Sequence, residues 1–177
     1  MSSQLPSREQ ALKILHDAGC SKSVIAHCKA VSKLAEKTAQ ACQKKGYSVD
    51  VELVTIGALL HDVGRSKTHS VDHVVAGAEI AHTLGLPDAV VTIIERHVGG
   101  GVTDKEAQEL GWPKRSYMPV SLEEKIVSYA DKLVETDNTR VPIKETVDKL
   151  RAANLNDAAD RVQKIHKEIS AIIGENP

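Results

Sequence analysis

Apolar residues recur at intervals of three and four along most of the chain, the spacing that places them on one face of an α-helix. Residues that cap helix starts precede these stripes, and glycines follow them. The pattern predicts helices over about 7–19, 21–45, 50–64, 71–84, 87–98, 103–111 and 121–134, with two last helices between 142 and 173. No strand-length alternating run is present, so we expect an all-α fold.

Composition refines this prediction without changing it. A chain of 177 residues is long enough to bury one sizeable core, so 1–177 is expected to form a single compact multi-helix domain. Phenylalanine is absent and aromatic residues make up 2%, which means that Ala, Val, Leu and Ile must build the core. The formal charge of -1, with both signs interspersed, provides no clear nucleic-acid surface.

The amino terminus and the cysteines indicate where the protein is located. Met1 to Ser7 is short and polar, and no apolar run reaches the roughly 18 residues of a membrane span, so we expect no membrane association and a cytoplasmic location. Cys20, Cys28 and Cys42 show no CxxC spacing and are interpreted as reduced thiols. No heptad seam is long enough to predict an oligomeric state.

Two polar residues interrupt the apolar stripe of the helix predicted over 50–64. Val54 and Ala58 are followed, at the next stripe positions, by His61 and Asp62. Burying such groups costs free energy unless they are paired, hydrogen-bonded or bound to a metal. A helix end could also satisfy them, with the histidine against a backbone carbonyl.

His27 and Asp131 occupy similar positions on the apolar faces of two other predicted helices. Each alone could be an ordinary, partly buried polar residue. Together with His61 and Asp62 they supply the mixed nitrogen and oxygen ligands that suit Mn, Fe, Ni, Zn or Mg. The four residues therefore predict a divalent-metal site.

The order His27, His61-Asp62 and Asp131, on helices, resembles the H…HD…D signature of the HD-domain superfamily. The run His61-Asp62-Val63-Gly64-Arg65 also resembles the HDIG variant of that family. The resemblance covers about residues 21–137, the expected core of the metal site. It implies an α-helical domain in which His27, His61, Asp62 and Asp131 coordinate one metal ion.

The same resemblance raises the question of a second metal ion. Binuclear members add a histidine in an H-x-x-x-G context and further histidines after the next helix, which His73 to Gly77 and His97 match. Val98 departs from the pattern, because relatives often carry a second histidine there, and a G-Y-P motif is missing. Cyclic-di-GMP hydrolysis is therefore not favoured. His73 could instead simply begin its helix, and His97 could interact with its own helix end.

The resemblance implies a metal-dependent phosphohydrolase, a phosphomonoesterase or phosphodiesterase that acts on a nucleotide or another small phosphorylated molecule. A divalent ion activates water, and Asp62 or Asp131 could orient that water. Arg65 and Lys67 could neutralise phosphate charge, although basic loop residues can also be merely solvated. His97 or His73, if free of metal, could protonate the leaving oxygen.

Two other functions fit the same motif: an oxygenase with paired iron ions, and a non-catalytic helical module that binds a nucleotide or a metal. The irregular segment 99–120 is expected to be a loop or lid over the pocket, with Arg115 or Tyr117 offering substrate contacts.

Overall fold

The computed structural model describes residues 4–174 and confirms the all-α prediction. Within that range the only β-type contacts are two isolated bridges, Val102–Tyr117 and Val134–Arg140. The helices and the two short 3₁₀ helices are α1 (Arg8–Ala18), α2 (Lys22–Lys44), α3 (Val51–Leu60), η1 (Val63–Ser66), α4 (His73–Thr83), α5 (Asp88–Arg96), η2 (Val98–Gly100), α6 (Asp104–Glu109), α7 (Leu122–Lys132), α8 (Ile143–Ala152) and α9 (Asn156–Ile173).

The predicted capping residues begin their helices as expected. Ser7, Thr103 and Ser121 each form a capping box, in which the hydroxyl accepts a backbone N–H three residues on and the Gln or Glu side chain there accepts the cap's own N–H. Ser21 and Asp50 cap α2 and α3 through their side chains. Local hydrogen bonding therefore fixes where these helices start.

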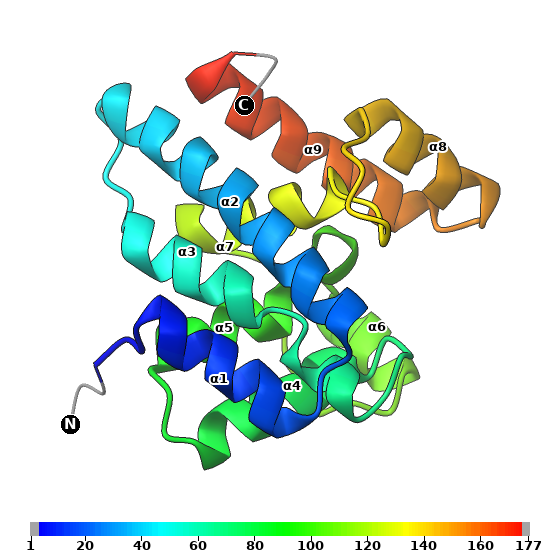
Figure 1. The fold of residues 1–177 in the computed structure, drawn as a ribbon. Helices are drawn as coiled ribbons and strands as arrows, with labels where there is room; N and C mark the ends of the chain where they lie inside the picture. The colour runs from blue at the N-terminus through cyan, green and yellow to red at the C-terminus, as the bar shows by residue number, and fades with distance from the viewer. Residues whose placement is uncertain (1–3, 175–177) are drawn as a thin grey trace.

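Helix α2 crosses the middle of the molecule and packs against both α3 and α7, which also contact each other (Figure 1). α1, α4 and α5 lie on one side of this group, and the α8–α9 pair lies on the other. Small and aliphatic residues fill the interior, as the composition predicted, and the cluster between α2, α3, α7 and α9 is built around Val31, Ala35, Ala58, Ile126 and Ile169.

Two glycines let the turn after α3 approach α4 closely. A Cβ at Gly64 would lie 1.9 Å from the carbonyl oxygen of His73, and one at Gly77 would lie 3.2 Å from the backbone nitrogen of Gly64. No side chain fits there, since van der Waals contact needs about 3.5–4.0 Å. The glycine of the H-x-x-x-G pattern thus lets His73 sit against the His61-Asp62 turn.

Three helices that carry candidate site residues end earlier than the sequence pattern suggested. α5 ends at Arg96, so His97 follows the helix and does not belong to it. α3 ends at Leu60, so His61 and Asp62 lie in the turn before η1 and not inside a helix that runs to Gly64. α7 ends at Lys132, where the N–H of Leu133 returns to the carbonyls of Ala130 and Asp131, so Asp131 lies near the end of the helix and not at its middle.

The segment 99–120 packs against the protein body. It contains η2 and α6, and the indole of Trp112 donates a 2.7 Å hydrogen bond to Asp72 beside the start of α4. Tyr117 is fully buried and pairs with Val102 through two backbone hydrogen bonds. Arg115 forms an ion pair with Glu95 and stacks on Tyr117. These contacts fix the segment in place.

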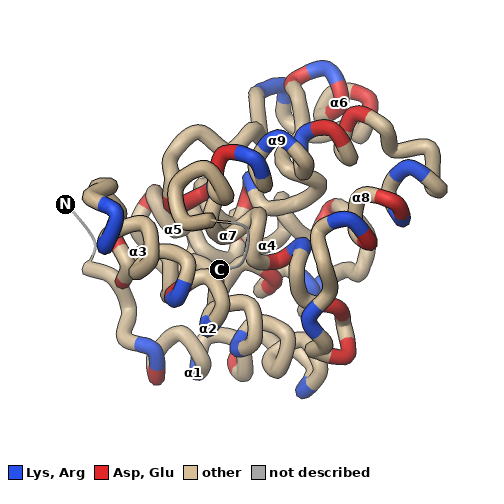
Figure 2. The backbone as a smooth tube through the Cα atoms, turned by 90° about the horizontal axis from the view of Figure 1, so that it is seen from above, with Lys and Arg blue, Asp and Glu red and all other residues tan. Residues whose placement is uncertain are grey.

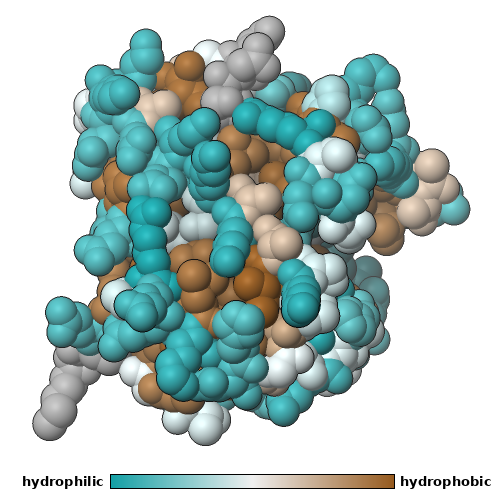
Figure 3. Space-filling model, viewed as in Figure 1, coloured by the Kyte–Doolittle hydropathy of each residue, from teal (hydrophilic) through white to brown (hydrophobic). Residues whose placement is uncertain are grey.

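The surface carries both charges without a one-signed stripe (Figure 2). Acidic and basic residues alternate along the helices, as the sequence indicated. On the side of the molecule that faces the viewer in Figure 1, apolar residues are exposed between rows of hydrophilic side chains (Figure 3). No helix within residues 4–174 is both long and apolar enough to cross a membrane.

Candidate metal centre

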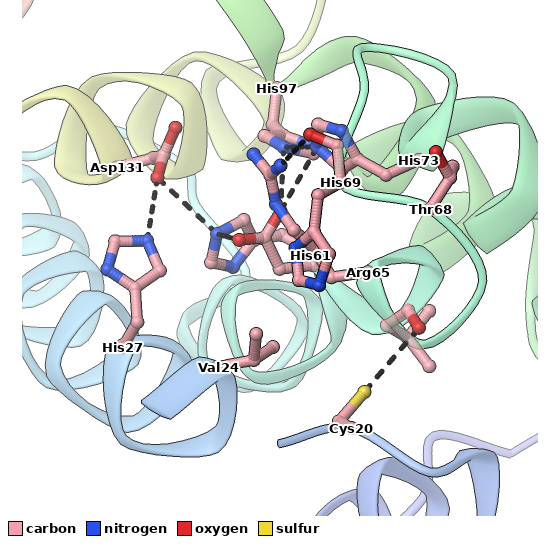
Figure 4. Close-up of polar contacts among 12 residues, drawn as sticks. Cys20, Val24, His27, His61, Arg65, Thr68, His69, His73, His97 and Asp131 are labelled. Atoms are coloured by element: carbon pink, nitrogen blue, oxygen red, sulfur yellow. Dashed lines mark hydrogen bonds and ion pairs between the residues drawn. The ribbon is translucent and has the colours of Figure 1, made fainter. Parts of the chain in front are cut away.

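Six side chains from α2, the α3–η1 turn, α4, the residue that follows α5, and α7 converge in the interior (Figure 4). Asp131 Oδ1 lies 3.0 Å from Nε2 of His27 and 3.4 Å from Nε2 of His61. Asp62 faces His61 through Oδ2 at 3.6 Å, while its Oδ1 lies 3.1 Å from Nε2 of His73 and 3.5 Å from Nε2 of His97. The structure thus brings all the predicted ligands together, with His61 between the two carboxylates.

Backbone carbonyls orient three of the four histidines. Nδ1 of His61 lies 2.6 Å from the carbonyl oxygen of Ala58, Nδ1 of His73 lies 2.7 Å from that of Ser70, and Nδ1 of His97 lies 2.8 Å from that of Ile94. A carbonyl accepts a hydrogen bond only from a protonated nitrogen. The proton of each neutral ring is therefore on Nδ1, and the Nε2 lone pair faces the centre, the arrangement found in metal-ligating histidines.

When His73 and His97 are both protonated on Nδ1, their two Nε2 lone pairs face each other and require a cation between them. Their Nε2 atoms are 3.2 Å apart, and the Oδ1 atom of Asp62 is near both. Three electron-rich acceptors at such distances repel one another unless a proton or a metal ion lies among them. The same is true of His61, whose Nε2 atom is fully buried and has no hydrogen-bond partner.

The donor chemistry therefore fits a divalent ion. Two groups of three ligand atoms, each within 4.8 Å of one another, could hold a metal ion: His27 with His61 and Asp131, and His61 with Asp62 and His97. His61 belongs to both groups. His73 adjoins the second through its contacts with Asp62 and His97.

The electrostatics favour ionised carboxylates in this interior. Burial alone would raise the pKa of Asp62, but the charge on His61 and the close contacts with His73 and His97 outweigh burial and lower it strongly. Burial opposes ionisation of Asp131 too, and the Lys132 ammonium together with His27 and His61 outweighs it and lowers the pKa.

The pKa values of His61 and His97 shift in opposite directions. Burial lowers the pKa of His97 to about 4, against the opposing effect of Asp62, so this ring is neutral and able to ligate. Burial acts to lower the pKa of His61 as well, but Asp62, Cys28 and Asp131 together outweigh burial and raise it. In the absence of a metal, a proton on His61 supplies the positive charge that the two carboxylates require.

A cavity of about 500 Å³ opens onto the centre. His27, Asp62 and Asp131 form one part of its lining. Arg65 lines it, with Nε 3.2 Å from Asp62 Oδ1 and Nη1 donating to the carbonyl oxygen of His69. Lys67 is exposed and is not among the lining residues. No residue of 99–120 lines this cavity, so the segment does not act as the lid that the sequence suggested.

Sequence reasoning missed the residues that complete the cavity. Lys132, directly after Asp131, lies with Nζ 2.6 Å from Asp131 Oδ2. Thr146, Lys149 and Leu150 come from α8, and Glu135 from the loop that precedes it. The position of Lys132 beside a predicted ligand was a usable signal. The contribution of α8 was not, because nothing in its sequence shows where the helix packs.

Comparison with known proteins places this geometry in a family. The HD domain model matches residues 24–135, which contain all six converging side chains. The chain belongs to the HD domain family. A solved HD domain of the L. monocytogenes phosphodiesterase PgpH, in complex with cyclic-di-AMP, covers 92% of this chain and 94% of its own, with a TM-score of 0.56 and 19% identity. At that identity the likeness shows a shared fold.

Two relatives are more similar in sequence. An uncharacterized protein of Methanocaldococcus jannaschii is 47% identical over 93% of this chain and 92% of its own length. A tRNA (cytidine(56)-2'-O)-methyltransferase of Picrophilus torridus is 42% identical over 97% of this chain but only 49% of its own length. The HD domain chain thus spans about half the length of the methyltransferase that it matches.

Proposed function

We propose that this HD domain protein is a metal-dependent phosphohydrolase that cleaves a phosphate ester of a small molecule, with a nucleotide as the favoured substrate. The observation that carries the proposal is the convergence of four histidine Nε2 atoms and two carboxylates beside a cavity that also presents Arg65 and Lys132. Ligands for a divalent ion and cations for a phosphate thus adjoin one another.

His27, His61, Asp62 and Asp131 would hold one divalent ion, and His73 and His97, with Asp62, would hold a second. Such ions polarise phosphoryl oxygens and lower the pKa of water towards neutrality, which supplies the nucleophile for hydrolysis. Because nitrogen and oxygen ligands accept several metals, Mn, Fe, Ni, Zn and Mg all remain candidates.

The chain's own residues would then position the phosphate and balance its charge. Phosphoryl transfer depends mainly on orientation and on neutralising the equatorial oxygens. Arg65 approaches from η1 beside Asp62, and Lys132 approaches from α7 beside Asp131, so the two cations flank the centre on different sides. Each would bind a non-bridging oxygen of the phosphate. We assign no such part to Lys67, which does not line the cavity.

The comparisons support the phosphate-ester chemistry in a limited way. The solved PgpH domain is described as a phosphodiesterase and binds cyclic-di-AMP, which favours a nucleotide for this chain as well. The methyltransferase name of the longer relatives contributes less, since this chain spans only about half of them.

The test is to reconstitute the protein with each metal in turn and to measure phosphate and nucleoside release from a panel of nucleotides and cyclic dinucleotides. We expect turnover that falls at least about 100-fold in His61→Ala and Asp62→Ala, because both remove central ligands. His82→Ala, at an exposed site, is the matched control. Turnover that survives both substitutions, or none with any metal and substrate, contradicts the proposal.

Metal content distinguishes the two other candidate functions. Two iron ions per chain after anaerobic purification, with substrate-dependent oxygen uptake and no phosphate release, would identify an oxygenase. Metal or nucleotide binding that stabilises the fold without turnover would identify a non-catalytic module.

A further inference from the structure

We infer that the site selects the phosphate monoester of an uncharged organic molecule and discriminates against substrates with a second phosphate, an inference that rests on the proposed phosphohydrolase function. The evidence is the uneven distribution of charge along the cavity. One part of the lining holds the ligands with Arg65 and Lys132, and another holds Glu135 and Lys149. Glu145 does not line the cavity but pairs with Lys149 from outside it, and we call Glu135, Glu145 and Lys149 the outer cluster.

The part beside the ligands can accept one phosphate. Arg65 and Lys132 each pair with a carboxylate that would bind metal, Asp62 and Asp131 respectively. When those carboxylates coordinate a cation, the metal takes up their charge, so both side chains become available to an incoming anion. A single dianionic phosphate therefore finds both its metal ligands and its two organic cations here.

The outer cluster contains more carboxylates than cations. Lys149 Nζ lies 2.5 Å from Glu135 Oε1 and 3.0 Å from Glu145 Oε1, so two carboxylates share one ammonium group. Glu135 and Lys149 both line the cavity, and their side chains are 34% and 56% exposed. A second phosphate that extended to this wall would meet the Glu135 carboxylate, and it could recruit Lys149 only by displacing both Glu135 and Glu145 from the ammonium group.

The rest of the lining suits a neutral body. Val24, Val134 and Leu150 supply apolar surface, and Thr146 donates its hydroxyl to the carbonyl oxygen of Lys132. Ser23, His69 and Thr136 add polar groups that suit the hydroxyl groups and ring nitrogens of an organic body. The cavity of about 500 Å³ lies within the range of roughly 300–1,000 Å³ typical of small-molecule sites. A nucleoside monophosphate meets these requirements, with its phosphate on the ligands and its nucleoside along this wall.

The experiment compares kcat/KM for adenosine 5′-monophosphate and adenosine 5′-diphosphate on the full chain reconstituted with its metal. We expect the monophosphate to be preferred by about tenfold or more. Glu135→Gln should reduce that preference at least about threefold, because it removes a repelling charge, and Lys149→Gln should increase it. Both effects should shrink as ionic strength rises.

Glu168→Gln is the matched control. Glu168 is a similarly exposed carboxylate in an ion pair, with Lys125 at 2.7 Å, but it does not line the cavity, and its substitution should leave the preference unchanged. A purely structural role of the outer cluster would shift both test variants in the same direction. That result, or a diphosphate used as well as the monophosphate, overturns the inference.

Binding measurements separate this inference from the proposed function. The dissociation constants of hydrolysis-resistant phosphonate analogues of the two nucleotides, measured by calorimetry on the metal-loaded protein, should show the same preference and the same opposite shifts in the two variants. Absence of turnover would contradict the phosphohydrolase proposal alone. Equal binding of both analogues would contradict the selection of a monoester, whether or not turnover occurs.

Discussion

At the scale of single residues, the rings of His61 and His97 each use one nitrogen for a backbone hydrogen bond and direct the other towards the candidate metal centre. The sequence left two explanations open for His61 and His97: contact with a backbone carbonyl at a helix end, or a ligand role. In the structure each Nδ1 bonds the carbonyl three residues earlier, at Ala58 and Ile94, and the opposite nitrogen faces the centre. The two explanations are therefore compatible, and the carbonyl contact is what aims the ligand atom.

His27 is the exception among the four histidines. Its Nδ1 atom is buried without a hydrogen-bond partner, while Nε2 lies 3.0 Å from Asp131. The position of His27 early in α2 gave no indication of this difference, because the ring's surroundings come from α7, far along the chain. The sequence could predict a histidine at this site but not that Asp131 is the residue that orients its ring.

The cysteines provide a prediction at this scale. Burial, with smaller effects of Cys28 and Asp62, raises the pKa of Cys20 to about 11. Because only the thiolate reacts, the alkylation rate of Cys20 by iodoacetamide should keep rising to above pH 10 in the folded protein. In urea it should level off above the ordinary thiol pKa of about 8.5. Peptide mass mapping reads each cysteine separately, and a folded-state profile that levels off near pH 9 would contradict the expectation.

At the scale of elements, helix starts were predictable and helix ends were less so. A start depends on a capping side chain within three residues, which the sequence displays at Ser7, Thr103 and Ser121. α3 ends just before His61 and Asp62, and α7 ends one residue after Asp131, and no local residue signals either end. The metal site thus lies where the local signal is weakest.

The glycine contact between η1 and α4 provides the prediction at this scale. Gly64→Ala should destabilise the protein by about 3 kcal/mol, because the added methyl group meets the carbonyl oxygen of His73 and forces the turn away from α4. It should also weaken metal binding, since the displaced backbone carries His73. Chemical denaturation and metal titration measure the two effects.

Gly85→Ala is the control for that substitution. A Cβ there meets no atom within 4 Å, but φ is +65°, so the expected cost is only the roughly 1 kcal/mol of a left-handed non-glycine residue. Metal affinity should be unaffected. Equal losses of stability in the two variants would show that steric overlap at Gly64 is not what requires glycine.

At the scale of the whole molecule, the site joins elements that are far apart in sequence. His27 and Asp131 are 104 positions apart, and the other ligand side chains come from α4 and from the turns that follow α3 and α5. Such a centre resembles a set of crosslinks that exists only in the folded state. A bound ion should therefore stabilise the whole fold, and its removal should loosen all the elements that meet there.

The size of this effect follows from linkage. At a free metal concentration 100 times the dissociation constant, binding to the folded state adds about 2.7 kcal/mol, which corresponds to a rise in Tm of about 5–10 °C for a domain of this length. A chelator should reverse the rise. His61→Ala should abolish it, because His61 belongs to both candidate groups of ligands, whereas His82→Ala should retain it. An equal rise in Tm for His61→Ala would mean that the stabilising ion binds elsewhere. The buried Nε2 atom of His61, which has no hydrogen-bond partner, would then not be explained by a metal ion.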